Sequence, residues 1–139
     1  MTALSTHVLD TVRGEPASGV VVRLERAGPA GGAPGTGHDG GWPEPDGAAS
    51  AGGCAELARA VTDADGRVSD FGVAGPLPAG TYRLVFGTGP YLAARHPGEP
   101  GGQPFFPEVV VTFNADGRRP RYHVPLLLSP FSYSTYRGS

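Results

Sequence analysis

Two histidines occupy apolar, β-branched runs in which their side chains could act as general bases. His7 alternates with Val8 in the first run, and His123 alternates with Val124 near the end of the chain. Because successive side chains of a strand point to opposite faces, each histidine is expected to face away from the core. A neutral imidazole, with a pKa near ~6.5, can accept a proton from water around neutrality. A single histidine on a strand is more often a solvent-exposed or hydrogen-bonded structural residue, so catalysis does not follow from either position alone.

Arg67 is a third candidate, because a guanidinium group presents a planar fork of hydrogen-bond donors. It follows Asp65 and Gly66 at the start of an expected strand, where an arginine is ordinarily a solvated turn residue. The last two residues, Gly138 and Ser139, would ordinarily be a frayed terminus. From the residues alone, a functional and a structural interpretation stay open at each of these positions.

The elements that would position these side chains are short strands, since apolar residues recur with a period of two rather than about 3.6. The runs lie at 4–9, 20–25, 55–62, 82–86, 109–113, 121–128 and 131–136. The run 55–62 contains good helix formers, but it leads directly into the turn sequence TDADG, which favours a strand. One brief helix is predicted at 90–95. These elements predict an all-β antiparallel sandwich with Greek-key connections and one short helix.

A length of 139 residues predicts one domain, 1–139, since domains cluster near ~100–150 residues. The chain has 23 glycines and 15 prolines, and many of them concentrate at 28–53 together with alanine and serine. This segment has too little apolar surface to offset the entropy of ordering it. We therefore predict a flexible Gly/Pro-rich insert between two strands.

Charge and cysteine content exclude several classes of protein. A formal net charge of −2 argues against a nucleic-acid or membrane binder. The single cysteine, Cys54, allows no intramolecular disulfide and no cysteine-based zinc site. No run approaches the ~20 apolar residues of a membrane span, and the first residues lack the charged and apolar regions of a signal peptide. We expect a soluble, cytoplasmic protein.

The last two predicted strands carry a second face that is neither fully polar nor fully apolar. In the run 121–128, His123, Pro125 and Leu127 are expected to share the outward face. In the run 131–136, Tyr136 shares a face with two serines. The apolar residues beside His123 predict a surface that another subunit covers.

Five sequence strings together resemble one known family, the transthyretin-related 5-hydroxyisourate hydrolases. They are LSTHVLDT (4–11), TDADGR (62–67), FFPEV (105–109), YHVPLLLSP (122–130) and YSTYRGS (133–139). The resemblance runs from end to end in the same order, except for the insert at 28–53, which is longer than the family usually carries.

The resemblance implies a transthyretin-like sandwich of two four-stranded sheets, assembled as a homotetramer with active sites in a channel at the dimer–dimer interface. The positions that match the family's functional residues are His7, Arg67, His123, Tyr136 and Ser139. Transthyretin itself is similar in the SPFSYST run, but it lacks the two histidines and the YRGS ending.

The reaction that the resemblance implies is hydrolysis of 5-hydroxyisourate to 2-oxo-4-hydroxy-4-carboxy-5-ureidoimidazoline in urate degradation. His123 is assigned as the general base and His7 as the residue that orients water or substrate, although the reverse order stays open. Arg67 would stabilise charge on the carbonyl oxygen, and a buried arginine there would lower the pKa of the histidines. Tyr136 and Ser139 would bind the substrate and close the site. No cofactor and no metal are expected, since the sequence offers no helical histidine pair and no cysteine cluster.

Two other classes of protein compete with the enzyme. A transthyretin-like carrier would hold a small aromatic ligand in the same channel without turnover, and the fold alone does not exclude it. The pair His7 and His123 together with the YRGS ending favours the hydrolase, because a carrier needs no general base. An immunoglobulin-like adhesion domain would predict a secretory signal and a Cys-Trp-Cys pattern, and the sequence has neither.

Overall fold

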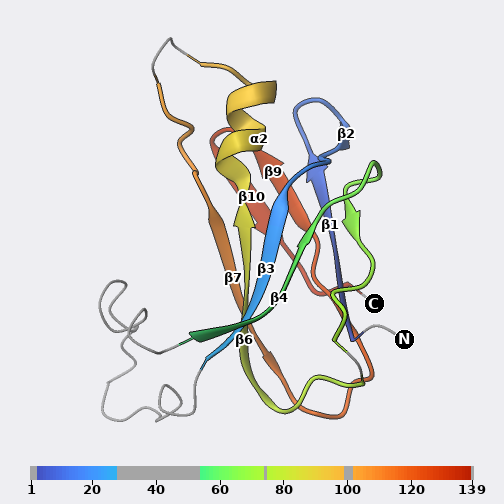
Figure 1. The fold of residues 1–139 in the computed structure, drawn as a ribbon. Helices are drawn as coiled ribbons and strands as arrows, with labels where there is room; N and C mark the ends of the chain where they lie inside the picture. Colours follow the sequence, from blue (N-terminus) through green and yellow to red (C-terminus); the bar gives the residue numbers. More distant parts are fainter. Residues whose placement is uncertain (1–2, 28–53, 74, 99–101, 139) are drawn as a thin grey trace.

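The computed structural model describes residues 3–27, 54–73, 75–98 and 102–138, which form two β-sheets and one helix (Figure 1). The predicted insert at 28–53 and the predicted site residue Ser139 lie outside the described residues. The all-β sandwich with one short helix is confirmed.

The first sheet has four antiparallel strands in the order β4-β3-β6-β7. Its strands are β3 (Val21–Ala27), β4 (Cys54–Val61), β6 (Gly80–Gly87) and β7 (Val109–Ala115). The strand predicted at 55–62 is therefore confirmed as β4. The TDADG turn that follows ends it, as expected for a turn-forming sequence.

The second sheet is built around β1 and contains six short strands rather than four. These are β1 (Leu4–Asp10), β2 (Glu15–Pro16), β5 (Arg67–Val68), β8 (Tyr122–His123), β9 (Leu126–Ser129) and β10 (Ser132–Thr135). The run predicted at 121–128 is divided because Pro125, between β8 and β9, has no N–H group to donate to the ladder.

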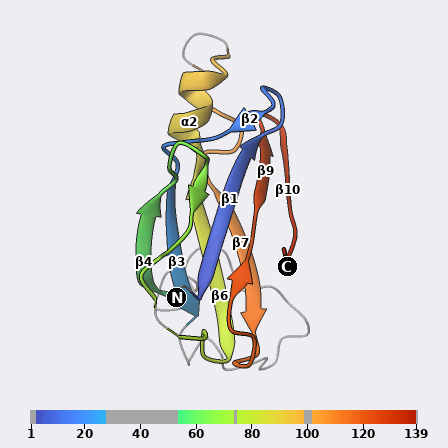
Figure 2. The same cartoon turned by 90° about the vertical axis from the view of Figure 1, so that its right-hand side faces the viewer.

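The second sheet is also not antiparallel throughout, in contrast to the prediction. β1 pairs in parallel with β8 and β9, and antiparallel with β2 and β5. β1 lies near the start of the chain, whereas β8 and β9 lie near its end. The four strands of the first sheet therefore lie between β1 and β8 in the sequence. Figure 2 shows β10 at the outer edge, beside β9.

The predicted helix is confirmed as α2 (Thr88–Arg95), which begins two residues earlier than expected. It lies beyond the end of β6 (Figure 1) and buries Tyr91 and Leu92. The hydroxyl group of Thr88 donates to the carbonyl oxygen of Phe106 at 2.7 Å and anchors the first turn. No helix in the described part of the chain is long and apolar enough to cross a membrane.

Side-chain alternation along β1 is confirmed. Leu4, Thr6 and Val8 are buried between the sheets, whereas His7 is half-buried on the other face. Pro125, predicted to lie on an outward face that another subunit covers, is instead buried within this chain. The C-terminal segment lies against it, and the hydroxyl group of Thr135 donates to its carbonyl oxygen at 2.6 Å.

Candidate active site

The turn between β4 and β5 places Arg67 opposite His7. One carboxylate oxygen of Asp63 accepts hydrogen bonds from the backbone N–H groups of Asp65 and Arg67, at 2.8 and 3.0 Å. Gly66 has a φ of +74°, and a Cβ atom there would lie 2.5 Å from the carbonyl oxygen of Val8. Glycine is required here by both the backbone conformation and the close approach. The result is that Arg67 and His7 are register partners of β5 and β1.

Parallel pairing of β8 with β1 brings His123 to the same face. His123 is the register partner of Ser5, and Ser5 and His7 point to the same side of β1 because they are two residues apart. Ser5 Oγ lies 2.9 Å from Nδ1 of His123. His7, Arg67 and His123 therefore come from three adjacent strands of one sheet.

Gly138 packs against the imidazole ring of His123. Its N–H group donates to the carbonyl oxygen of His123 at 2.7 Å, and the two residues form an isolated β-bridge. A Cβ atom on Gly138 would lie 2.6 Å from Cδ2 of His123. The YRGS ending thus places a residue without a side chain beside the ring.

Arg67 and His123 line one pocket of about 350 Å³. Its complete lining is Ser5, Thr6, Arg67, Val68, Ser69, Arg121, Tyr122 and His123. Arg67 is exposed rather than buried, which corrects the expectation of a buried arginine, because β5 is two residues long and lies directly after a surface turn. Its guanidinium group is free to reach a ligand in the pocket.

The electrostatic environment of His123 favours the neutral imidazole. Burial lowers its pKa, and the positive charges of Arg67 and His7 lower it further, against a hydrogen bond to the Ser5 backbone that raises it. A neutral imidazole accepts a proton, so the site suits a general base. Among the described residues, no three His, Cys, Asp or Glu side chains are arranged as metal ligands, and a cofactor-free reaction stays a prediction.

The structure does not bring all the predicted residues together. Tyr136 is 58% exposed and lines a different pocket, of about 280 Å³, together with Tyr122 and Arg137. Ser139 lies outside the described residues. Within the described part of one chain, the cluster therefore consists of His7, Arg67 and His123.

Sequence reasoning missed Ser5 and Arg121, which face the same pocket as His123. A signal was present for both. Ser5 and His7 share a face of the first run, and Arg121 and His123 share a face of the run that contains YHVP, because in each pair the residues are two apart.

A comparison with protein-family models matches residues 4–138 to the transthyretin model, described as the HIUase/Transthyretin family. The chain belongs to the HIUase/transthyretin family. A relative in this family from Caulobacter vibrioides, named 5-hydroxyisourate hydrolase, is 40% identical over 141 residues and is aligned over 100% of both chains.

Solved structures of HIUase/transthyretin proteins have the same fold. The 5-hydroxyisourate hydrolase of Klebsiella pneumoniae has a TM-score of 0.67 and 34% identity, covering 100% of both chains. Transthyretin from Sparus aurata has a TM-score of 0.72 and 29% identity, covering 99% of this chain and 97% of its own. Because both resemble this chain closely, the HIUase/transthyretin fold does not by itself distinguish a hydrolase from a transthyretin.

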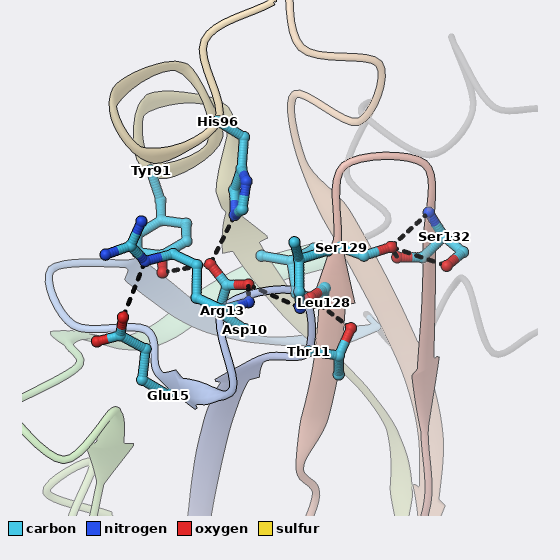
Figure 3. A network of polar contacts seen from close by, with 10 residues as sticks. Asp10, Thr11, Arg13, Glu15, Tyr91, His96, Leu128, Ser129 and Ser132 are labelled. Atoms are coloured by element: carbon cyan, nitrogen blue, oxygen red, sulfur yellow. Dashed lines mark hydrogen bonds and ion pairs between the residues drawn. The ribbon is translucent and has the colours of Figure 1, made fainter.

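This HIUase/transthyretin chain also contains a buried polar network that lies apart from the candidate site. Tyr91 Oη and His96 Nε2 each lie 2.7 Å from the same carboxylate oxygen of Asp10 (Figure 3). The other oxygen accepts from the backbone N–H groups of Val12 and Arg13. Burial raises the pKa of Asp10, but the hydrogen bonds outweigh it and hold that pKa below its ordinary value. His96, predicted as a structural or surface residue, joins the end of α2 to the end of β1.

Proposed function

We infer that this chain is a 5-hydroxyisourate hydrolase of urate degradation. The observation that carries the inference is the convergence of Arg67 and His123 on one pocket, with His7 as the register partner of Arg67. A relative of that name aligned over 100% of both chains supports it. His7 and His123, together with the YRGS ending, favour the enzyme over a carrier, because a carrier needs no general base.

In the proposed mechanism His123 is the general base. Its lowered pKa keeps the imidazole neutral around neutrality, and with Nδ1–H donating to Ser5 Oγ the Nε2 lone pair is free to take a proton from water. The hydroxide equivalent adds to a ring carbonyl carbon. Arg67 then stabilises the oxyanion, and the carbon–nitrogen bond breaks as nitrogen takes up a proton.

His7 is proposed to orient the water or the substrate. It sits on β1 opposite Arg67, two residues from the serine that contacts His123. Exchange of the two histidine roles gives the same chemistry, and single variants of each distinguish the assignments.

The proposed assembly is a homotetramer with the sites at the dimer–dimer interface. Support comes from large apolar side chains that a single chain leaves exposed, namely Phe131 in the turn before β10, at 78%, and Tyr133 in β10, at 41%. The candidate pocket is open at the surface of one chain, so a neighbouring subunit would close it. Tyr136 and Ser139 are proposed to bind substrate in that assembly.

A carrier of small aromatic ligands is the alternative, and the resemblance to Sparus aurata transthyretin favours it. The two functions differ in turnover. A carrier would bind a ligand stoichiometrically and leave the decay of 5-hydroxyisourate unchanged.

The deciding experiment follows the ultraviolet absorbance of freshly generated 5-hydroxyisourate with the wild-type chain and with His123→Ala. Faster decay with the wild type alone supports both the hydrolase and the role of His123. Equal acceleration by both proteins keeps the enzyme but overturns the assignment of the base. If the folded wild-type chain does not accelerate the decay of 5-hydroxyisourate, the result supports a carrier instead of a hydrolase.

A further inference from the structure

One residue, Asp63, bonds to both main-chain polar groups of Arg67. The N–H group of Arg67 donates to a carboxylate oxygen of Asp63 at 3.0 Å. The carbonyl oxygen of Arg67 accepts from the N–H group of Asp63 at 2.9 Å. β1 holds the residue before Arg67 instead, since the N–H group of Val8 donates to the carbonyl oxygen of Gly66 at 2.7 Å. The main chain of Arg67 is therefore fixed by Asp63.

The remaining bonds of Asp63 close the same turn. Its bonded carboxylate oxygen also accepts from the N–H group of Asp65 at 2.8 Å, and its carbonyl oxygen accepts from the N–H group of Gly66 at 2.8 Å. β5, which follows, is only two residues long. Because so short a strand contributes few ladder bonds, the bonds of Asp63 carry much of the positioning of Arg67.

The position of the Arg67 side chain depends on this main-chain support. Arg67 is exposed, and among the described residues no carboxylate, carbonyl oxygen or aromatic ring contacts its guanidinium group. The guanidinium group is therefore located by its own side chain and by the place where the main chain is held. An error of ~1 Å in a catalytic group can lower the rate by about a hundredfold.

The charge of Asp63 is a poor explanation for any benefit to catalysis. The N–H groups of Arg67 and Asp65 hold the pKa of Asp63 below its ordinary value, and the positive charges of Arg67 and His7 lower it further. The carboxylate is thus ionised at neutral pH near the guanidinium group. A negative charge there would weaken the attraction of Arg67 for an oxyanion, so the useful feature of Asp63 is its acceptor oxygen.

We propose that Asp63 is a positioning residue for the hydrolysis, which acts as a hydrogen-bond acceptor that holds Arg67 where its guanidinium group reaches the developing oxyanion. The proposal rests on the proposed function. It implies that the acceptor geometry at residue 63 matters for turnover and that the negative charge does not.

The test compares variants of the full chain in steady-state hydrolysis of 5-hydroxyisourate. Asp63→Asn keeps an acceptor oxygen and removes the charge, whereas Asp63→Glu keeps the charge and displaces the carboxylate by a methylene group. We expect Asp63→Glu and Asp63→Ala to lower kcat about tenfold, and Asp63→Asn to retain kcat within about twofold. The matched control is Asp65→Ala, because Asp65 is exposed in the same turn and its side chain accepts no hydrogen bond from the described residues. Full activity of Asp63→Glu, or an equal loss in Asp63→Asn and Asp63→Ala, would overturn the proposal.

An NMR titration of His123 separates positioning from a general loss of stability. Burial lowers the pKa of His123, and the charge of Arg67 lowers it further, so displacement of Arg67 should move the midpoint to higher pH. Asp63→Glu is expected to do this, and to add nothing to the effect of Arg67→Gln on the midpoint or on kcat when the two are combined. An unmoved midpoint or additive effects would overturn the proposal. If the wild-type chain gives no turnover, the hydrolase is rejected, and the midpoint of Asp63→Glu still decides whether Asp63 positions Arg67.

Discussion

Ser5 Oγ lies 2.9 Å from Nδ1 of His123, so the partner of the proposed base is supplied by a strand 118 residues away in the sequence. This contact engages one ring nitrogen, and in the proposed mechanism the other nitrogen accepts the proton. Orientation of an imidazole through its second nitrogen determines which nitrogen can accept a proton.

Replacement of Ser5 by alanine is expected to lower kcat about tenfold or less, since one net hydrogen bond contributes ~1 kcal/mol. KM should change little, because Ser5 acts through His123 rather than on the substrate. Steady-state kinetics with Ser69→Ala as the control test this, since Ser69 lines the same pocket. An equal loss in both variants would contradict a positioning role.

The pKa of His123 is expected to lie below 6.5. An NMR titration of its ring protons measures this directly. Arg67→Gln removes one of the positive charges that lower the pKa, so the midpoint should move to higher pH. The acid limb of kcat/KM in wild type should follow the NMR midpoint, with activity falling as the imidazole becomes protonated. If Arg67→Gln left the titration midpoint unchanged, Arg67 would not contribute to the lowered pKa of His123.

Gly66→Ala is expected to destabilise the fold and to reduce activity. A left-handed conformation costs a non-glycine residue ~1–2 kcal/mol, and the new Cβ atom would also lie 2.5 Å from the carbonyl oxygen of Val8. Gly72→Ala is the control, since Gly72 has a φ of +79° but nothing within 4 Å of an added Cβ. Urea unfolding and turnover are measured for both variants. Gly72→Ala reports the conformational cost alone, so the additional loss in Gly66→Ala is the effect of the clash with Val8.

The C-terminus is expected to matter for activity rather than for stability. Gly138→Ala places a Cβ atom 2.6 Å from Cδ2 of His123, so the ring must move and turnover should fall. Removal of residues 138–139 should also lower activity, while circular dichroism and the unfolding midpoint stay close to wild type. If turnover were unchanged after truncation, residues 138–139 would have no role in the active site.

The Asp10 network should make stability depend on pH. The folded pKa of Asp10 is lowered, so its stabilising contribution is fully present above its unfolded pKa, about 4, and is lost as the pH falls through the folded pKa. Asp10→Asn should reduce the free energy of unfolding at pH 7 by about 1–3 kcal/mol, and less at pH 3. Asp70→Asn is the control because Asp70 is exposed and, among the described residues, its side chain accepts a hydrogen bond only from the Gly72 N–H group. Equal effects at both pH values would contradict this assignment.

Alternation along β1 and the position of α2 followed from the sequence, because both depend on the nearest neighbours in the chain. Leu4, Thr6 and Val8 are buried and His7 is not, as a period of two requires. The same local logic predicted β4, where the turn after it outweighed the helix propensity of 55–61. The motifs also indicate His7, Arg67 and His123 as functional residues, although nothing in the local sequence specifies that they lie together.

Tertiary structure alone decided which residues surround His123. The parallel pairing of β1 with β8, the contact of Ser5 with the ring and the position of Gly138 join segments from opposite ends of the chain. The same holds for Asp10 and His96, which are 86 residues apart. Such pairings depend on the path of the whole chain and on packing between sheets, which no local pattern of residues specifies.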